Sequence, residues 1–255
     1  MLKELYNYRQ LLKSNVRKEI RGKYKGSFLG VLWSFVNPLL TTLVYAIVFP
    51  FILRGGQEHY TTFIVIAILP WSWFTTVISQ GTNTILANGG IIKKVYFPRE
   101  ILPLSIAVSG LINFLISCII IMIFLFCSGI GFSFYILLLP IIVVIQFILS
   151  FAIVLITSSI DVYVRDLEYI INFFISMLFY ATPVLYSMDM FPKKIQMLLH
   201  LNPMATIIES YRNIFFYQTM PNMIGLLFVF IFSIVLLLIG IKVFKKLEKG
   251  FAEEL

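Results

Sequence analysis

The chain has 255 residues, of which 60% are hydrophobic and 13% are charged, and its formal net charge is +8. With a mean hydropathy of +0.94, it carries more apolar side chain than a soluble domain of this length needs. The composition therefore excludes a soluble globular protein and predicts a polytopic membrane protein. The excess of Lys and Arg is interpreted as the positive bias of cytoplasmic loops, and no nucleic-acid partner is expected.

Residues 1–25 predict a basic amphipathic helix that lies in the cytoplasmic interface of the membrane. Leu5, Leu12 and Val16 fall on roughly one helical face, whereas Lys13 and Arg17 fall mostly elsewhere. The helix either anchors the chain to membrane lipid or also offers a docking surface to a cytoplasmic partner. The segment contains no apolar core of the length that a signal peptide requires, so no cleavable signal is expected.

The junction after this helix sets the orientation of the chain. Arg21, Lys23 and Lys25 precede an uncharged run, Gly26–Phe51, which exceeds the roughly 20 apolar residues that a membrane-crossing helix needs. Basic residues beside a span hold that end on the cytoplasmic side. Trp33 lies too deep in the run to be only an interfacial anchor, so it faces either a neighbouring helix or a lumen.

The expected fold class is an all-α membrane protein with six transmembrane helices. The predicted spans are residues 28–53, 62–87, 101–127, 134–160, 169–187 and 222–243. Six spans with both ends inside place most of the 20 Lys and Arg residues in the cytoplasm, whereas five or seven spans would put the C-terminal lysines outside. Residues 1–255 are therefore expected to form one transmembrane domain, with the interface helix at 1–25, the spans within 28–243 and a cytoplasmic tail at 244–255.

The cytoplasmic connection from Ala87 to Glu100 mixes apolar and basic residues and predicts a short helix that Pro98 ends. This connection is either a basic loop that only satisfies the positive-inside rule or a knob that fits a groove on a partner protein. The candidate contact residues are Ile91, Lys93, Lys94, Phe97 and Arg99.

The connection from about Thr182 to Pro221 is expected on the outer side and is broken by prolines. Its amphipathic pieces, 193–201 and 204–217, are too short to cross the membrane. They predict short interfacial or re-entrant helices between spans five and six. These helices either close the external mouth of a pathway or form a cap without a gating role.

The predicted spans carry no Asp, Glu, Lys, Arg or His in their cores. Ion-coupled carriers usually place such groups at membrane depth, so this class is disfavoured, although backbone and polar side chains also bind Na⁺. The two histidines stand alone, which predicts no metal site, and the G-x-S-x-G and G-x-x-x-x-G-K-[ST] motifs are absent. No cofactor is therefore expected in this chain, and energy for active transport would come from another subunit.

Aromatic residues make up 16% of the chain, and those at mid-depth are candidates for a pathway lining. Uncharged aromatic faces stack on sugar rings, so such a lining suits a carbohydrate chain. The candidates are Trp33, Tyr45, Trp71, Trp73 and Tyr180.

A membrane-embedded transferase is the alternative from another class, and it requires acid/base or metal-binding groups at the interface. Only the segment from Asp161 to Glu168 offers acidic groups, and it lacks a histidine. Asp161 and Arg165 are expected to pair at i,i+4, so this segment is either a solvated helix cap or a hinge or partner contact.

Several groups of residues match one known family in the same order along the chain. The first group is Lys23, Tyr24, Lys25, Ser27, Leu29, Gly30, Leu32, Trp33 and Pro38, and the second is Ile91, Lys93, Phe97, Pro98, Arg99, Glu100, Leu102 and Pro103. The others are Arg165–Leu167 and the pairs Asn202–Pro203 and Tyr211–Arg212. Together they resemble the membrane subunit of type-2 ABC exporters, in particular the branch that exports polysaccharides of the O-antigen or teichoic acid type. The large extracellular domain of some drug- and lipid-exporting relatives is not seen.

The resemblance implies a homodimer around a central pathway in the bacterial plasma (inner) membrane, with both termini cytoplasmic. Each copy would bind a cytoplasmic P-loop ATPase subunit that carries ATP and Mg²⁺, so this chain itself is expected not to be an enzyme. The substrate would be a glycan on a polyprenyl-diphosphate lipid. Export of a smaller lipid or drug is the alternative within transport.

The resemblance also assigns expected roles to residues. Arg21, Lys23 and Lys25 would meet the diphosphate, with anchoring to anionic lipid as the competing interpretation. Residues 88–97 would form the coupling helix that transmits the motion of the ATPase. At the outer end, the candidates for a gate are Asn202, Pro203, Tyr211 and Arg212.

Overall fold

The computed structural model describes residues 6–22, 33–53 and 58–255. Every regular element within these ranges is a helix, which confirms the predicted all-α class for them. In chain order the elements are α2 (Arg9–Gly22), α3 (Trp33–Leu53), α4 (Tyr60–Thr82), α5 (Thr84–Ala87), α6 (Gly89–Ile92), α7 (Ile101–Cys127), η2 (Phe134–Leu138), α8 (Leu139–Asp161), α9 (Leu167–Tyr180), η3 (Met188–Met190), α10 (Lys193–Leu199), α11 (Pro203–Phe215), α12 (Met223–Leu247), η4 (Glu248–Gly250) and α13 (Phe251–Glu254).

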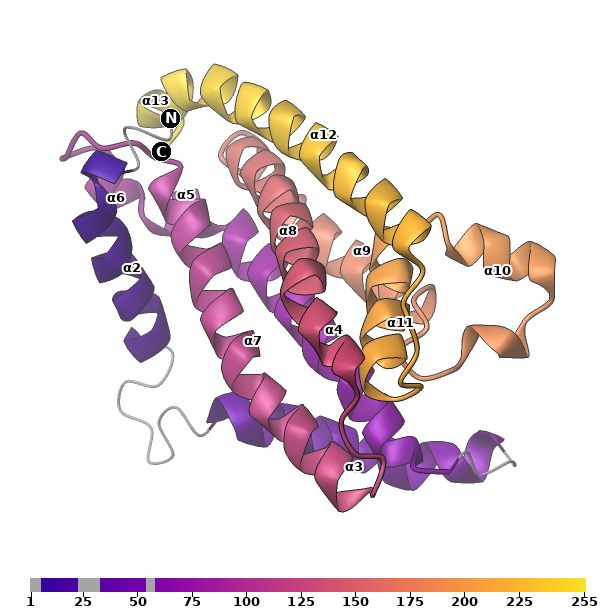
Figure 1. Ribbon diagram of the computed structural model, residues 1–255. Coiled ribbons are helices and arrows are strands. Elements are labelled where there is room, and N and C mark those ends of the chain that lie inside the picture. Colours follow the sequence, from indigo (N-terminus) through magenta and orange to yellow (C-terminus); the bar gives the residue numbers. More distant parts are fainter. Residues whose placement is uncertain (1–5, 23–32, 54–57) are drawn as a thin grey trace.

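The long helices form one bundle in which α4 packs against α7 and α8, and α12 lies along α8 (Figure 1). The short helices α5, α6 and α13 gather at one end of the bundle, here called the α6 end. The helices α10 and α11 lie toward the opposite end, here called the α11 end. The predicted cytoplasmic and outer connections therefore lie at opposite ends of the bundle.

Four helical stretches of the described chain are long and apolar enough to cross a membrane: Tyr60–Thr82, Ile101–Cys127, Phe134–Asp161 and Met223–Glu254. The protein is thus a multi-pass membrane protein. These stretches correspond to four of the six predicted spans. Of the first predicted span, residues 28–32 lie outside the described ranges, and the remainder forms the 21-residue helix α3.

The fifth predicted span, 169–187, contains a shorter helix than expected. The helix α9 has 14 residues, which gives it a length of about 21 Å against a hydrocarbon core of about 30 Å. Thr182 precedes a proline, and this position disfavours helical backbone. The Asn202 side chain also donates to the carbonyl of Ala181, with 3.3 Å between the two atoms. The chain therefore turns at the end of α9 instead of continuing as a helix.

The helix α2 packs along α7 at the edge of the bundle. Val16 is buried, whereas Lys13 and Arg17 are exposed. The apolar side of α2 therefore has a protein neighbour, while Lys13 and Arg17 face outward.

Small residues allow α4 to approach its neighbours closely. Gly110 of α7 faces Trp73, and a Cβ added there would lie 3.1 Å from the indole ring. Gly81 of α4 faces Val154 of α8, where a Cβ would lie 2.5 Å from a valine methyl carbon. Neither position has room for a larger side chain, so these contacts fix the distances between the helices.

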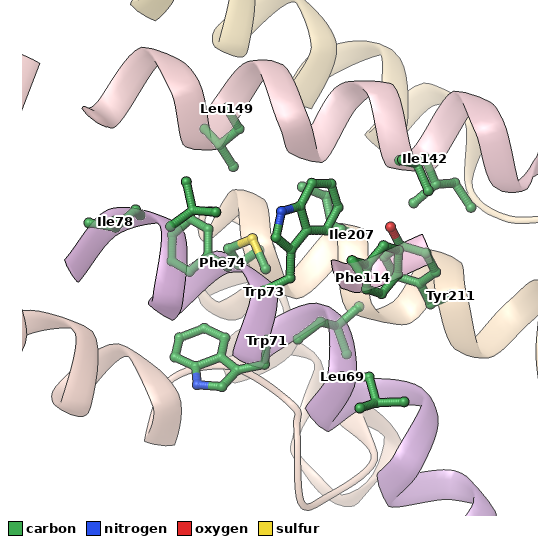
Figure 2. Close-up of a cluster of buried hydrophobic side chains, with 14 of the residues drawn as sticks. Leu69, Trp71, Trp73, Phe74, Ile78, Phe114, Ile142, Leu149, Ile207 and Tyr211 are labelled. Atoms are coloured by element: carbon green, nitrogen blue, oxygen red, sulfur yellow. The ribbon is translucent and has the colours of Figure 1, made fainter. Parts of the chain in front are cut away.

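An aromatic cluster joins α4, α7 and α11 in the core (Figure 2). Trp73 stacks on Phe114, with ring centroids 4.7 Å apart, and Tyr211 meets the same phenylalanine edge-on at 5.7 Å. Figure 2 shows Trp71 and Trp73 leaving α4 on opposite sides. Because the two tryptophans face different neighbours, α4 contacts protein on more than one side.

Candidate functional site

Asn88 joins the two short helices at the α6 end. Its side-chain amide donates to the carbonyl of Thr84 at 2.8 Å, and its side-chain oxygen accepts from Lys18 at 3.2 Å. This residue therefore links the connection between α5 and α6 to helix α2. The sequence identifies Asn88 only as the start of the expected coupling helix, because its link to α2 depends on a contact with a residue 70 positions away.

The coupling candidates are divided between exposed and anchored positions. Ile91, Lys93 and Lys94 are exposed, Phe97 is buried, and Arg99 is half-buried. The helix in this connection covers only Gly89–Ile92, shorter than the predicted 88–97. The exposed residues form a projection whose base is held by the buried Phe97.

Arg99 connects this loop to the C-terminal end of the chain. Its guanidinium donates to the carbonyl of Glu248 and lies 5.8 Å from the ring centroid of Phe251. Phe251 is fully buried and also meets Phe244 edge-on at 5.6 Å, while the Tyr163 hydroxyl donates to the Leu247 carbonyl at 2.8 Å. The predicted tail, 244–255, is thus helical and folds back onto the α6 end.

A depression of about 810 Å³ lies between the loop and the end of α12. Its charged lining residues are Arg99, Glu100, Lys245, Lys246, Glu248 and Lys249. Four of these six are basic, so the surface beside the projection favours an acidic contact.

At the α11 end, Asn202 starts helix α11 and ties it to the end of α9. Its side-chain oxygen accepts from the Met204 backbone N–H at 3.0 Å, and its amide donates to the Thr182 hydroxyl at 2.8 Å. Pro203 occupies the first turn, where a missing N–H costs no helical hydrogen bond. The Asn202–Pro203 pair therefore forms the N-terminus of α11 and holds it against the end of α9.

Arg212 is a buried cation that organises the same end. It is 1% exposed and donates to the carbonyls of Tyr186, at 2.9 Å, and Val184, at 2.7 Å. Burial lowers the pKa of Arg212 to about 9, so the side chain is still protonated at neutral pH. Its neighbour in sequence, Tyr211, is also fully buried and packs on Phe114.

The aromatic candidates differ in exposure within the single chain. Trp71 and Trp73 are buried, Trp33 and Tyr45 are half-buried, and Tyr180 is 73% exposed. The structure therefore gathers Trp71 and Trp73 into the core and leaves Tyr180 on the surface.

The basic candidates fall at the edge of the described ranges. Arg21 belongs to α2, while Lys23 and Lys25 lie outside the described residues.

A polar cavity of about 310 Å³ also lies at the α6 end, where α2, α4, α7 and α9 converge. Asn83 donates to a Glu168 carboxylate oxygen there, with 2.6 Å between the atoms. Glu19, Ser79 and Gln80 contribute further polar groups to its wall. The sequence pattern singles out Glu168 only as the end of the acidic segment from Asp161, and Glu19, Ser79, Gln80 and Asn83 were not selected from it. The regular spacing of polar residues between 72 and 83 was nevertheless a visible signal.

Residues 10–216 match the model of the family described as "ABC-2 type transporter". The chain belongs to this family. The matched range holds the loop of the α6 end and helix α11, both of which the ABC-2 resemblance had singled out.

Relatives of the ABC-2 chain extend the similarity over its full length. A protein of Myxococcus xanthus named "O-antigen export system permease protein RfbA" is 34% identical over 257 residues, which cover 100% of this chain and 99% of the relative. Two proteins of the same name from Klebsiella pneumoniae are each 35% identical over 237 residues, covering 92% of this chain and 91% of theirs. The predicted membership of the ABC transporter membrane family is confirmed.

Proposed function

We propose that this chain is the permease subunit of an ATP-driven exporter that moves a lipid-linked polysaccharide of the O-antigen or teichoic acid type across the bacterial plasma membrane. The observation that carries this proposal is the similarity, over 100% of the chain, to a protein named as an O-antigen export permease. The membership in the ABC-2 family supports the transport role independently of the substrate.

The proposed topology has six spans, with α3 and α9 as the first and fifth, and with the α6 end and both termini in the cytoplasm. Exposed lysines at this end support the orientation, because Lys93 and Lys94 line one hollow and Lys245 and Lys246 line a second. The two hollows share Tyr96, Phe97 and Arg99. In this orientation α10 and α11 face the outside and form a short re-entrant or interfacial pair.

The proposed energy source is a cytoplasmic P-loop ATPase that carries ATP and Mg²⁺. Two copies of the permease would each bind one ATPase subunit. The exposed Ile91, Lys93 and Lys94 form the projection that would enter a groove on this partner, and Phe97 and Arg99 would pass its motion to α7 and to the docked C-terminus. A projection held at its base transmits force better than a free loop.

The proposed path of the substrate starts at the cytoplasmic leaflet. Arg21, Lys23 and Lys25 would pair with the diphosphate of a polyprenyl-linked glycan, since clustered basic side chains bind phosphate strongly. The aromatic candidates would supply stacking surfaces, of which Tyr180 is the most exposed. At the outer end, α11 would serve as a gate, with Asn202, Pro203, Tyr211 and Arg212 holding it closed.

The test is a deletion of the chain in a cell that displays the polysaccharide. The proposal expects loss of surface polysaccharide, accumulation of the lipid-linked glycan inside, and restoration by the wild-type chain. A tagged chain should also copurify with a P-loop ATPase and raise its ATP turnover. Normal surface display in the deletion strain, or transport by the purified chain alone, would contradict the proposal.

A further inference from the structure

Helix α4 carries a polar stripe on one face, although most of the helix is apolar and buried. Ser72, Thr76, Ser79 and Asn83 follow one another at i, i+4, i+7 and i+11, which is the spacing of a single helical face. Thr75 and Gln80 flank them, and each of the six is half-buried or exposed. The stripe rises about 16 Å over these residues, roughly half of the hydrocarbon thickness.

The opposite face of α4 fixes the direction in which the stripe points. Phe74, Val77, Ile78 and Gly81 are all buried. Figure 2 shows Phe74 and Ile78 in the packed core. The polar stripe therefore faces away from the core of this chain. Hydropathy does not determine how α4 is rotated about its own axis. The packing of its apolar face determines this rotation.

The hydroxyls of the stripe are largely free for an external partner. Thr75 donates to the carbonyl of Ser72 at 3.2 Å. The side chains of Ser72, Thr76, Ser79 and Gln80 make no hydrogen bond within the described parts of the chain. Unsatisfied hydroxyls and amides are unfavourable against lipid, so such a face in a membrane helix lies against water, a ligand or another polar surface.

The stripe leads into the polar cavity at the α6 end. Ser79, Gln80 and Asn83 belong to both, and the volume of about 310 Å³ is at the lower end of the range for small-ligand sites. Among the described residues that line the cavity, Glu19 and Glu168 are the charged ones, and both are acidic. Carboxylates accept hydrogen bonds from hydroxyl groups and repel phosphate.

We infer that the polar stripe of α4 and this cavity form the cytoplasmic entrance of the sugar path, in which hydroxyl and amide side chains hydrogen-bond to the glycan. This inference rests on the proposed function and names the part of the chain that contacts the sugar. It separates two sites by charge: Arg21, Lys23 and Lys25 are suited to the diphosphate, and the acidic cavity to the neutral sugar units.

The stripe also shows where this path stops in the present structure. Continuing the same face toward the α11 end gives Val65, Ile68 and Leu69, all of which are apolar and at most 3% exposed. The hydroxyl-lined half of α4 is therefore accessible from the α6 end and covered above it. A sugar that enters along the stripe meets a closed apolar layer halfway through the membrane.

Accessibility is tested in the complete transporter, in inside-out vesicles, with Cys118 and Cys127 first replaced by Ala and Ser. A membrane-impermeant maleimide should label Thr76→Cys and Ser79→Cys at least about tenfold faster than Ile119→Cys, because only a wetted thiol ionises and reacts. Ile119 is the matched control, since it is 57% exposed but lies on the apolar helix α7, away from the polar stripe. Equal, slow labelling of all three variants would overturn the inference.

The ligand is tested by repeating the labelling in vesicles from cells that make the glycan and from cells that do not. Protection of Ser79→Cys only in the first set supports a sugar site. Protection by inorganic pyrophosphate in the second set would overturn it in favour of a phosphate site.

Export is tested with Thr76→Val and Gln80→Met, which keep shape and remove hydrogen bonds. Each should slow surface display about fivefold, the effect of one net hydrogen bond, while the buried Ser109→Ala should leave it unchanged. If the wild type exports the glycan and both variants export it at the wild-type rate, the inference is overturned and the proposed function is left intact. If the wild-type chain exports no glycan, both the inference and the proposed function are overturned. The wild type is measured first, so this outcome is distinguished from an effect of the variants.

Discussion

The guanidinium carbon of Arg212 lies 3.5 Å from the ring centroid of Phe63. This cation–π contact joins α11 to the central helix α4, and the same guanidinium holds the carbonyls of Val184 and Tyr186. One buried side chain therefore connects three segments of the α11 end: helix α11, the turn after α9, and α4.

Replacing Arg212 should destabilise this end strongly. In Arg212→Met the two carbonyls lose their donors in a buried place, so we expect the free energy of unfolding to fall by about 2–4 kcal/mol. The free energy of unfolding of Arg212→Lys should lie between those of the wild type and Arg212→Met, because one ammonium cannot match both carbonyls as a planar guanidinium does. Thermal unfolding in detergent measures the effect, with the exposed Arg165→Met as the control. If Arg212→Met is as stable as the wild type, the contacts of the guanidinium do not contribute to stability.

The docked C-terminus gives a second prediction. Phe251 is fully buried at the α6 end, and its replacement by Ala removes most of the apolar contact that holds η4 and α13. Because this segment is terminal, it should undock before the bundle unfolds, so proteolysis of a C-terminal tag should become about 100-fold faster. The exposed Glu253→Ala is the matched control. Equal cleavage rates for the two variants would mean that the tail is not held by Phe251.

The projection at the α6 end gives a third prediction. Reversing the charge of Lys93 and Lys94 to Glu should separate ATP hydrolysis from export, because both lysines are exposed where the ATPase is proposed to dock. We expect export to fall about tenfold or more while the chain still inserts into the membrane, and the coupling ratio of glycan exported per ATP to fall with it.

The chain offers a matched control for this charge reversal. Lys193 and Lys194 are also adjacent and exposed, but they lie at the α11 end. Changing both to Glu should leave coupling unaltered. If the two double variants behave alike, the effect of Lys93 and Lys94 is one of net charge and not of docking.

The sequence predicted the features that depend on composition and local pattern. The all-helical class, four of the six spans and the position of the loop before α7 follow from hydropathy and from proline and lysine placement, and the structure agrees with them. The end of α9 was placed too late, because apolar residues continue to Tyr186 while the Thr182–Pro183 step and the Asn202 side chain turn the backbone.

Side-chain environments were less predictable than elements. Trp71, Trp73 and Tyr180 were grouped as aromatic residues at mid-depth, yet two are buried and the third is largely exposed. Hydropathy does not determine the rotation of an apolar helix, and rotation decides which aromatic ring meets the core. The docking of Phe251 was missed for a related reason: a single apolar residue in a short tail has no periodic pattern to reveal it.

The interior polar contact between Gln146 and Pro70 gives the last prediction. Pro70 lies inside α4 and cannot donate to the carbonyl of Ile66, and the fully buried Gln146 of α8 donates to the Pro70 carbonyl at 2.8 Å. Gln146→Met keeps the volume and removes this donor, so we expect a loss of about 1 kcal/mol in the free energy of unfolding. Pro70→Ala supplies a backbone N–H for the carbonyl of Ile66. If the proline holds the Pro70 carbonyl in place for the Gln146 amide, the double variant should lose less stability than the sum of the two single variants. A double-mutant cycle of thermal unfolding measures the difference, and strict additivity would show that the proline and the hydrogen bond are independent.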